Sequence, residues 1–331
     1  ETGFKTPFFF FFVYNYDILT SQVGEYANLG EKYVIKELEN GIRVGIIGTF
    51  GTQQISSISS HFVDHLTFIN PINVVKDLSL ELRNKGCHIV ALSSHDSVED
   101  TAYLSDLSGN KMTDYVDLIF GGHSHQSERK LIDGVPCLQG AYNGRAISKI
   151  SLDLALDGTI TVNEYTNLYN DDFEVETDPE IEAIYNHYDS IAAETGQRVL
   201  ANLTSSISKS NAPYLMTASL ADYAIENELD IDYTLVNSAR NSIQETTLTY
   251  EELFRAFPFD NEVFIVEVKG QELRTNLNKN YFYRLDTEKL DNNKIYKCAI
   301  IDYVALHRNN LRDYDNFTYL NILGSYQKEG S

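Results

Sequence analysis

Short apolar runs alternate with polar loops over the first 170 residues of the chain. They occupy residues 8–13, 43–48, 88–93, 115–120 and 135–139. Uninterrupted apolar runs of this length are typical of strands that are buried on both faces of a sheet in an α/β layer. Between the second and third runs, Asn70-Pro71 precedes apolar residues at helical spacing, and Gly86 follows them. This arrangement predicts a capped helix, and hence a strand–helix–strand crossover.

The pattern changes after the last of these runs. Residues 149–154 and 159–162 flank Asp157-Gly158, which is a strong signal for an antiparallel hairpin. Residues 178–197 then predict a long polar helix with a single apolar face. That face consists of Ile181, Ile184, Tyr185, Tyr188 and Ile191. We interpret this helix as a connector between two domains.

A second mixed α/β domain is predicted beyond the connector. Its expected helices lie at residues 216–228, after the capping box at 249–252, and at 271–277; its expected strands lie at residues 233–236, 263–268 and 295–305. The predicted boundaries are 1–170 for the first domain, 171–198 for the connector helix and 199–331 for the second domain. A chain of 331 residues also exceeds the size of about 250 residues at which single cores tend to split.

The charge of the chain argues against some classes of ligand. The formal net charge is -22, whereas nucleic acids and acidic membrane surfaces attract proteins that carry a basic stripe. We therefore predict no nucleic-acid partner. The longest apolar run, residues 8–13, is far shorter than the roughly 20 residues that span a bilayer, so we predict no membrane span. A small anion remains possible where local cations outweigh the overall charge, because salt screens exposed charges.

The start of the chain bears on where the protein works, whereas the three cysteines say little about its compartment. Cys87, Cys137 and Cys298 form no closely spaced pair, and an odd number leaves at least one thiol unpaired. The chain opens on Glu1-Thr2-Gly3 without a methionine, which resembles a processed end. We therefore expect a secreted protein, extracellular or periplasmic.

The strongest candidate chemistry lies in Gly121-Gly122-His123-Ser124-His125, directly after an apolar run. Ligands of α/β sheets bind beyond the carboxyl ends of strands, and glycines there let the backbone turn closely. His95 ends the neighbouring run in the same way. Three imidazoles at adjacent strand ends predict a metal site, because neutral imidazole is a common ligand of zinc and related ions. The alternative is a glycine turn with a loop-capping histidine.

Two blocks of sequence resemble one known family. The first block is His95, then Asp117 to His125 in the order D-L-I-F-G-G-H-S-H, then Gly134-Val135-Pro136 leading to residues 139–144. It resembles the metallophosphoesterase domain of 5'-nucleotidases. The second block is Asn237-Ser238-Ala239-Arg240, then residues 257–261 followed by an apolar run. It is similar to the substrate loop and the base-binding segment of the C-terminal domain of the same family.

The resemblance implies a fold, a reaction and a set of site residues. The implied fold class is α/β, with a sandwich-type metallophosphoesterase domain followed by a mixed α/β C-terminal domain. The implied function is hydrolysis of a nucleotide or another small phosphoester with two divalent metal ions, zinc or manganese. The implied metal ligands are His95 and His123 for one ion and His125 for the second.

Substrate binding is implied for three residues of the second domain. By resemblance, Arg240 pairs with the phosphate, Asn237 contacts the nucleotide and Phe259 stacks on the base. The roles fit the chemistry, because guanidinium forks match phosphate oxygens and an aromatic face accepts any base. Without the surrounding motif, Arg240 would be read as a surface ion pair and Phe259 as a core aromatic.

The sequence also departs from the family pattern. The D-x-H, the bridging Asp and the N-H-E segment that supply the remaining ligands are expected before residue 8, and no catalytic acid or base is identified in the sequence as given. We therefore expect negligible turnover from this polypeptide alone, and the alternative function is a secreted, non-catalytic nucleotide-binding protein. The second base-stacking residue is also open, with Tyr303, Tyr314 and Phe317 as candidates.

Overall fold

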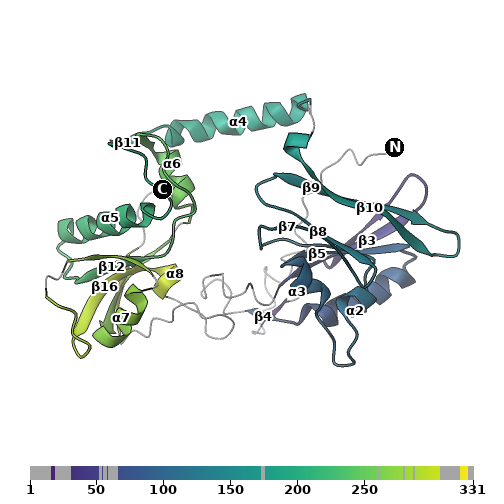
Figure 1. Cartoon of the computed structure of the whole chain (residues 1–331), viewed down its shortest axis with the longest axis horizontal. Helices are drawn as coiled ribbons and strands as arrows, with labels where there is room; N and C mark the ends of the chain where they lie inside the picture. Colours follow the sequence, from purple (N-terminus) through teal and green to yellow (C-terminus); the bar gives the residue numbers. More distant parts are fainter. Residues whose placement is uncertain are drawn as a thin grey trace. The chain divides into compact units, whose positions relative to one another are not determined.

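The computed structural model describes residues 16–18, 31–51, 54, 58, 66–172, 176–259, 261–278, 280–285, 288–305 and 321–326. The chain divides into two compact units, residues 1–175 and 176–331, which are described here one at a time (Figure 1). The strand expected at residues 8–13 lies outside the described residues, as do Tyr314 and Phe317. The finer boundaries expected for the connector stay a prediction.

The first unit is built on a six-stranded sheet in the order β2-β3-β5-β6-β8-β7. Its strands are β2 (Tyr33–Glu37), β3 (Arg43–Phe50), β5 (Ile89–His95), β6 (Leu118–Phe120), β7 (Ser127–Ile132) and β8 (Val135–Gly140). The four central strands pair in parallel, and β2 and β7 are antiparallel edge strands. The four apolar runs predicted as strands within the described part of the chain are confirmed. The run at 115–120 gives only the three-residue β6.

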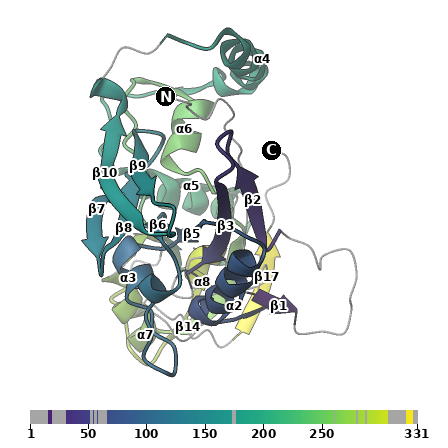
Figure 2. The same ribbon diagram turned by 90° about the vertical axis from the view of Figure 1, so that its right-hand side faces the viewer.

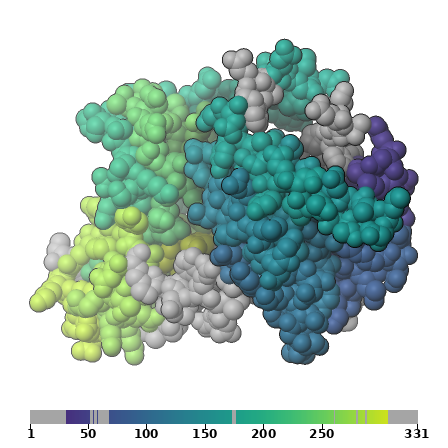
Figure 3. All heavy atoms as spheres, turned by 45° about the vertical axis from the view of Figure 1, so that its right-hand side comes forward, coloured from purple at the N-terminus to yellow at the C-terminus, as the bar shows by residue number. Residues whose placement is uncertain are grey.

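The two faces of this sheet are covered differently. Helix α2 (Pro71–Asn84) and the short α3 (Val98–Ala102) cover one face, and the hairpin of β9 (Ala146–Leu154) and β10 (Ile160–Tyr169) covers the other (Figures 1 and 2). The teal hairpin forms a strip on the surface of this unit in Figure 3. Further short elements are β1 (Tyr16–Ile18), β4 (Leu66–Phe68), and 3-10 turns at Met112–Asp114 and Asn170–Asp172. The result is the sandwich-type α/β layer expected from the sequence.

Helix α2 shows how local sequence sets these elements. The side chain of Asn70 accepts a hydrogen bond from the amide of Ile72, and Pro71 occupies the first turn. Its apolar face, which includes Leu78 and Leu82, is buried against the sheet. Gly86 follows at φ +78°, a left-handed conformation that glycine adopts without steric cost. The capped helix predicted from this pattern is confirmed.

The second unit contains a five-stranded mixed sheet in the order β15-β12-β16-β14-β17. Its strands are β12 (Tyr233–Val236), β14 (Val263–Lys269), β15 (Tyr281–Arg284), β16 (Ile295–Ile301) and β17 (Asn321–Tyr326). Helices α5 (Ala212–Glu226) and α7 (Gly270–Leu277) lie on opposite faces of the sheet (Figure 1). A smaller part of this unit holds β11 (Val199–Asn202), β13 (Thr247–Thr249) and α6 (Tyr250–Ala256). The mixed α/β architecture predicted for this region is confirmed.

Two predicted elements differ in detail from the structure. The long helix is present as α4 (Pro179–Gly196), but its apolar face is exposed and none of its residues is buried. The strand expected at 295–305 was wrong in its last four residues, which form helix α8 (Asp302–Ala305). The buried carboxylate of Asp302 accepts hydrogen bonds from the amide of Tyr303 and from the side chain of Asn261. These bonds turn the chain out of the strand.

The three cysteines provide a prediction on reactivity. All are free and buried, and desolvation raises the pKa of Cys137 to about 12 and that of Cys87 above its ordinary value. Because the thiolate is the reactive form, iodoacetamide at neutral pH is expected to leave the native chain unmodified and to label all three thiols in denaturant. Intact-mass spectrometry measures the number of labelled thiols. Rapid labelling of the native chain would contradict the burial described here.

Candidate functional site

The loop after β6 is shaped by its two glycines. The amide of Gly121 donates to the carbonyl of Leu138 at 2.8 Å, and the amide of Gly122 donates to the carbonyl of Asp96 at 2.9 Å. A Cβ atom on Gly121 would lie 2.6 Å from Cγ1 of Val98, closer than any packing allows. Only glycine therefore lets the loop approach the end of β5.

This close approach brings two of the predicted ligands together. His95 is the last residue of β5, and its Nε2 lies 3.1 Å from Nδ1 of His123. Two nitrogens that bind one tetrahedral zinc ion at about 2.1 Å are roughly 3.4 Å apart. The spacing of the pair therefore fits shared ligation of one ion, and one nitrogen donates a hydrogen bond to the other when no metal is bound. His123 adopts φ +58°, which is uncommon for a residue other than glycine.

The surroundings of His95 favour the neutral form of its ring. Burial lowers the pKa of the imidazole, the carboxylate of Asp96 opposes that shift, and His125 adds to it. The ring also stacks on Phe50, with ring centroids 5.5 Å apart. Asp96 is itself buried, and its Oδ1 accepts hydrogen bonds from the side chain of Gln54 and the amide of Ser97. Neutral imidazole is the form that binds metal ions.

His125 lies beside this pair and makes a different contact. Its ring stacks on Tyr142, with centroids 5.6 Å apart and planes at 24°. The hydroxyl of Ser124 donates to the buried Oε1 of Gln139 at 2.9 Å, which anchors the loop between the two histidines. No group of three or more His, Cys, Asp or Glu is placed to hold a metal ion among the described residues, which leave out most of 52–65.

The predicted substrate-binding residues of the second unit lie on two segments that are bonded to each other. Asn237 follows β12 and is half-buried. The amide of Arg240 donates to the carbonyl of Ala256 at 2.8 Å, and the side chain of Asn241 donates to the carbonyl of Arg255 at 2.8 Å. These bonds tie the loop after β12 to the last turn of α6.

The chain that leaves α6 brings Phe259 to Arg240. The guanidinium carbon of Arg240 lies 5.0 Å from the centroid of the Phe259 ring, a cation–π distance. Both side chains are exposed, Phe259 to 54%. The two residues to which the resemblance assigns the phosphate and the base are therefore in contact with each other, and their roles stay a prediction.

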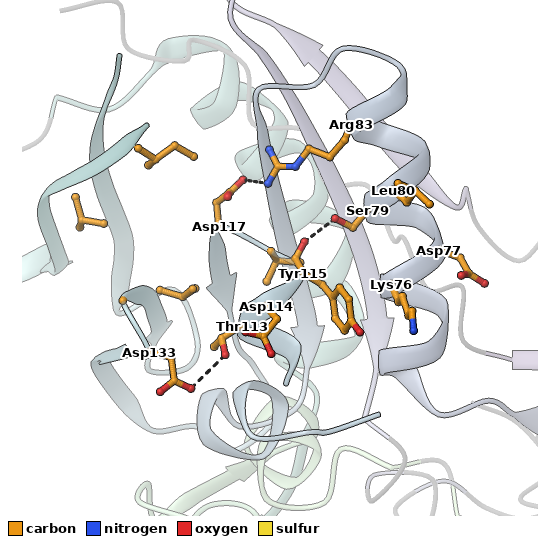
Figure 4. A pocket seen from close by; sticks show the side chains of 15 residues that line it. Lys76, Asp77, Ser79, Leu80, Arg83, Thr113, Asp114, Tyr115, Asp117 and Asp133 are labelled. Carbon is orange, nitrogen blue, oxygen red and sulfur yellow. Dashed lines mark hydrogen bonds and ion pairs between the residues drawn. The ribbon is translucent and has the colours of Figure 1, made fainter. Parts of the chain in front are cut away.

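A hollow of about 590 Å³ lies elsewhere on the first unit. Figure 4 shows it between α2 and the segments that precede β6 and β8. It is therefore at the opposite end of the parallel strands from His95 and His123. The two cations that line it are paired with carboxylates of the protein: Arg83 with Asp117 at 2.6 Å and Lys76 with Asp106 at 3.3 Å. We therefore place the candidate site at the histidine loops rather than in the hollow.

One of these ion pairs gives a stability prediction. Oδ2 of Asp117 accepts hydrogen bonds from Arg83 and from the buried amide of Val90, both at 2.6 Å. Asp117→Ala leaves that amide unpaired and is expected to lower the free energy of unfolding by about 2 kcal/mol. Asp77→Ala, an exposed change on the same hollow, is the control and should cost under about 0.5 kcal/mol. Urea denaturation measures both, and equal midpoints would contradict the assigned role.

Comparison with protein families finds a match within the second unit. The family described as "5'-nucleotidase, C-terminal domain" matches residues 187–284. The endonuclease YhcR of Bacillus subtilis is 25% identical over 250 residues, which are 72% of this chain and 20% of that protein. The cell wall protein Lmo0130 of Listeria monocytogenes is 24% identical over 291 residues, 75% of this chain and 37% of that protein. The chain thus spans well under half the length of these relatives.

Solved structures share the fold across both units. A 5'-nucleotidase precursor from Thermus thermophilus superposes with a TM-score of 0.69 at 16% identity, covering 88% of this chain and 68% of its own. A 5'-nucleotidase from Candida albicans gives 0.62 at 12% identity, covering 88% and 70%. The expected two-domain α/β fold, with a metallophosphoesterase-type domain first, is confirmed. The part of the chain that the structure describes contains no bilayer-spanning helix.

Proposed function

We propose that this chain, which matches the 5'-nucleotidase C-terminal domain over residues 187–284 and has the fold of solved 5'-nucleotidases, hydrolyses nucleotide phosphoesters with bound divalent metal ions. The observation that carries the proposal is the pair of imidazoles at adjacent strand ends, with Nε2 of His95 3.1 Å from Nδ1 of His123. Such a pair offers two nitrogen ligands to one metal ion, and that ion could also bind a phosphate oxygen of the substrate.

The residues of this pair suit a metal ion of the zinc and manganese class. His95 and His123 would hold one ion, and His125 would lie at a second. A bound divalent ion supplies a Lewis acid and an activated water for attack on phosphorus. The protein contributes a neutral ring at His95 and a loop whose glycines and Ser124–Gln139 bond hold His123 and His125 in place.

The second unit supplies recognition of the nucleotide. The fork of Arg240 pairs with phosphate oxygens, the exposed face of Phe259 stacks on the base, and Asn237 hydrogen-bonds the nucleotide. The 5.0 Å contact between Arg240 and Phe259 supports this assignment, because the phosphate and base of one nucleotide require a cation and an aromatic face close to each other.

A small nucleotide outside the cytoplasm is the proposed substrate. The net charge of -22 disfavours a polyanion, and one relative is named a cell wall protein. Another relative is named an endonuclease, so a polynucleotide is the second substrate to be tested.

The substrate class is tested by comparing two assays on the full chain with added Zn²⁺ or Mn²⁺. The departures from the family pattern in the sequence predict negligible turnover, whereas the paired histidines lead us to expect metal-dependent release of phosphate from AMP. We expect little cleavage of a single-stranded oligonucleotide at the same concentration of phosphodiester groups. Faster cleavage of the oligonucleotide would assign the chain to polynucleotides. Tight binding of AMP and adenosine without release of phosphate would favour the non-catalytic nucleotide-binding alternative.

A further inference from the structure

An arginine and a candidate metal ligand of the first unit contact the same tyrosine. Arg145 is in the turn between β8 and β9, and its guanidinium carbon is 4.8 Å from the centroid of the Tyr142 ring. That ring in turn stacks on His125 at 5.6 Å. Tyr142 therefore links a cation to the loop that carries the candidate ligands.

The turn that carries Arg145 contains three residues with positive φ. Ala141 at φ +59° and Asn143 at φ +53° are both left-handed, and Gly144 follows at φ +69°. Such residues cost free energy and persist where the surrounding structure requires them, often at binding sites. The amide of Arg145 donates to the carbonyl of Tyr142, and its own carbonyl accepts from the amide of Asn170, both at 3.1 Å. These two bonds therefore fix the backbone of the turn that carries Tyr142 and Arg145.

The charge of Arg145 is not neutralised by the protein. Its side chain is exposed, and no carboxylate of the described residues lies within ion-pair distance of it, whereas Arg83 and Arg255 both have acidic partners. Other described arginines, such as Arg129, also have no carboxylate partner, and what sets Arg145 apart is its contact with Tyr142, whose ring stacks on His125. Stacking on a ring leaves the edge of the guanidinium, with its N–H donors, open to an anion.

We propose that Arg145 binds the phosphoryl group of the substrate beside His125, so that the first unit has an anion-binding group of its own. Tyr142 is a positioning residue that holds the guanidinium at this place. The proposal rests on the proposed function, because the group that Arg145 would bind is the phosphoryl group of the proposed substrate. It goes beyond that function by predicting that inorganic phosphate binds whether or not the chain turns over a substrate.

The test is a titration of the full chain with inorganic phosphate, followed by phosphorus NMR line broadening, once with Zn²⁺ and once with EDTA. Arg145→Ala is expected to weaken phosphate binding about tenfold in both conditions, the loss of one charged hydrogen-bonding group. Arg129→Ala, which removes an exposed arginine of the same unit from β7, should leave binding unchanged. Tyr142→Phe keeps the stacked ring and should bind as the parent, whereas Tyr142→Ala should weaken binding.

The outcomes separate this inference from the proposed function. Weakened phosphate binding in Arg145→Ala alone supports the inference even if AMP is not hydrolysed. Absence of phosphate binding by the parent, equal binding by Arg145→Ala, or an equal loss in Arg129→Ala each overturns it. If the parent hydrolyses AMP and Arg145→Ala has the same KM and phosphate affinity, the proposed function stands and the inference fails. Thermal unfolding of each variant checks that the fold is retained.

Discussion

Replacing His123 by alanine is expected to weaken binding of Zn²⁺ to the chain by about 100-fold or more. Removal of outer partners of metal ligands already costs 10- to 100-fold in affinity, and His123 contributes one of the two nitrogens that lie 3.1 Å apart. Isothermal titration of the full chain with Zn²⁺ measures the change. The neighbouring His95 is still present in the variant, but a single imidazole holds an ion weakly.

The control for this experiment is a histidine without a candidate role. His187 is exposed on α4, and its ring contacts that of Tyr188. His187→Ala removes the same type of donor and should bind Zn²⁺ as the parent does. Equal affinity of the parent and His123→Ala would show that the zinc ion binds elsewhere, and the assignment of the metal ligands would be wrong.

Replacing Arg240 by alanine is expected to weaken binding of AMP about 30-fold and to leave adenosine binding nearly unchanged. A charged hydrogen bond to phosphate contributes about 2 kcal/mol, and adenosine carries no phosphate. Calorimetric titration of the full chain with both ligands measures the two affinities. The contrast between the ligands assigns the role, because general damage to the loop after β12 would weaken both.

A second arginine on the same unit serves as the control. Arg255 is exposed on α6 and pairs with Glu251 one turn earlier. Arg255→Ala should leave both affinities near those of the parent. A loss of adenosine binding as large as the loss of AMP binding in Arg240→Ala would mean that the arginine supports Phe259 rather than the phosphate.

Short-range signals in the sequence were sufficient for much of the fold. The helix after Asn70-Pro71 and the hairpin around Asp157-Gly158 form as predicted, because caps and turns depend on residues that are neighbours in the chain. The glycines before His123 also indicated a close turn at a strand end. Their necessity is visible only in the structure, where a side chain on Gly121 would meet Val98.

Contacts between distant segments were less predictable. The resemblance assigned His95 and His123 to one ion and His125 to a second, and the structure pairs His95 with His123, but the stacking of His125 on Tyr142 had no signal in the sequence. Residues 139–144 belong to the block that resembles the family, but the sequence assigns no role to Arg145 and predicts no special backbone conformation at this turn. Left-handed conformations at residues other than glycine follow from packing across the sheet, which no local pattern encodes.

The measurement that tests the central proposal most directly is release of inorganic phosphate from AMP by the full chain, before and after EDTA treatment and after Zn²⁺ is restored. We predict release that EDTA abolishes and Zn²⁺ restores, and that His95→Ala and His123→Ala both eliminate. Release that persists in EDTA, or that both variants retain at the parent rate, would contradict a metal-dependent hydrolase centred on these two histidines.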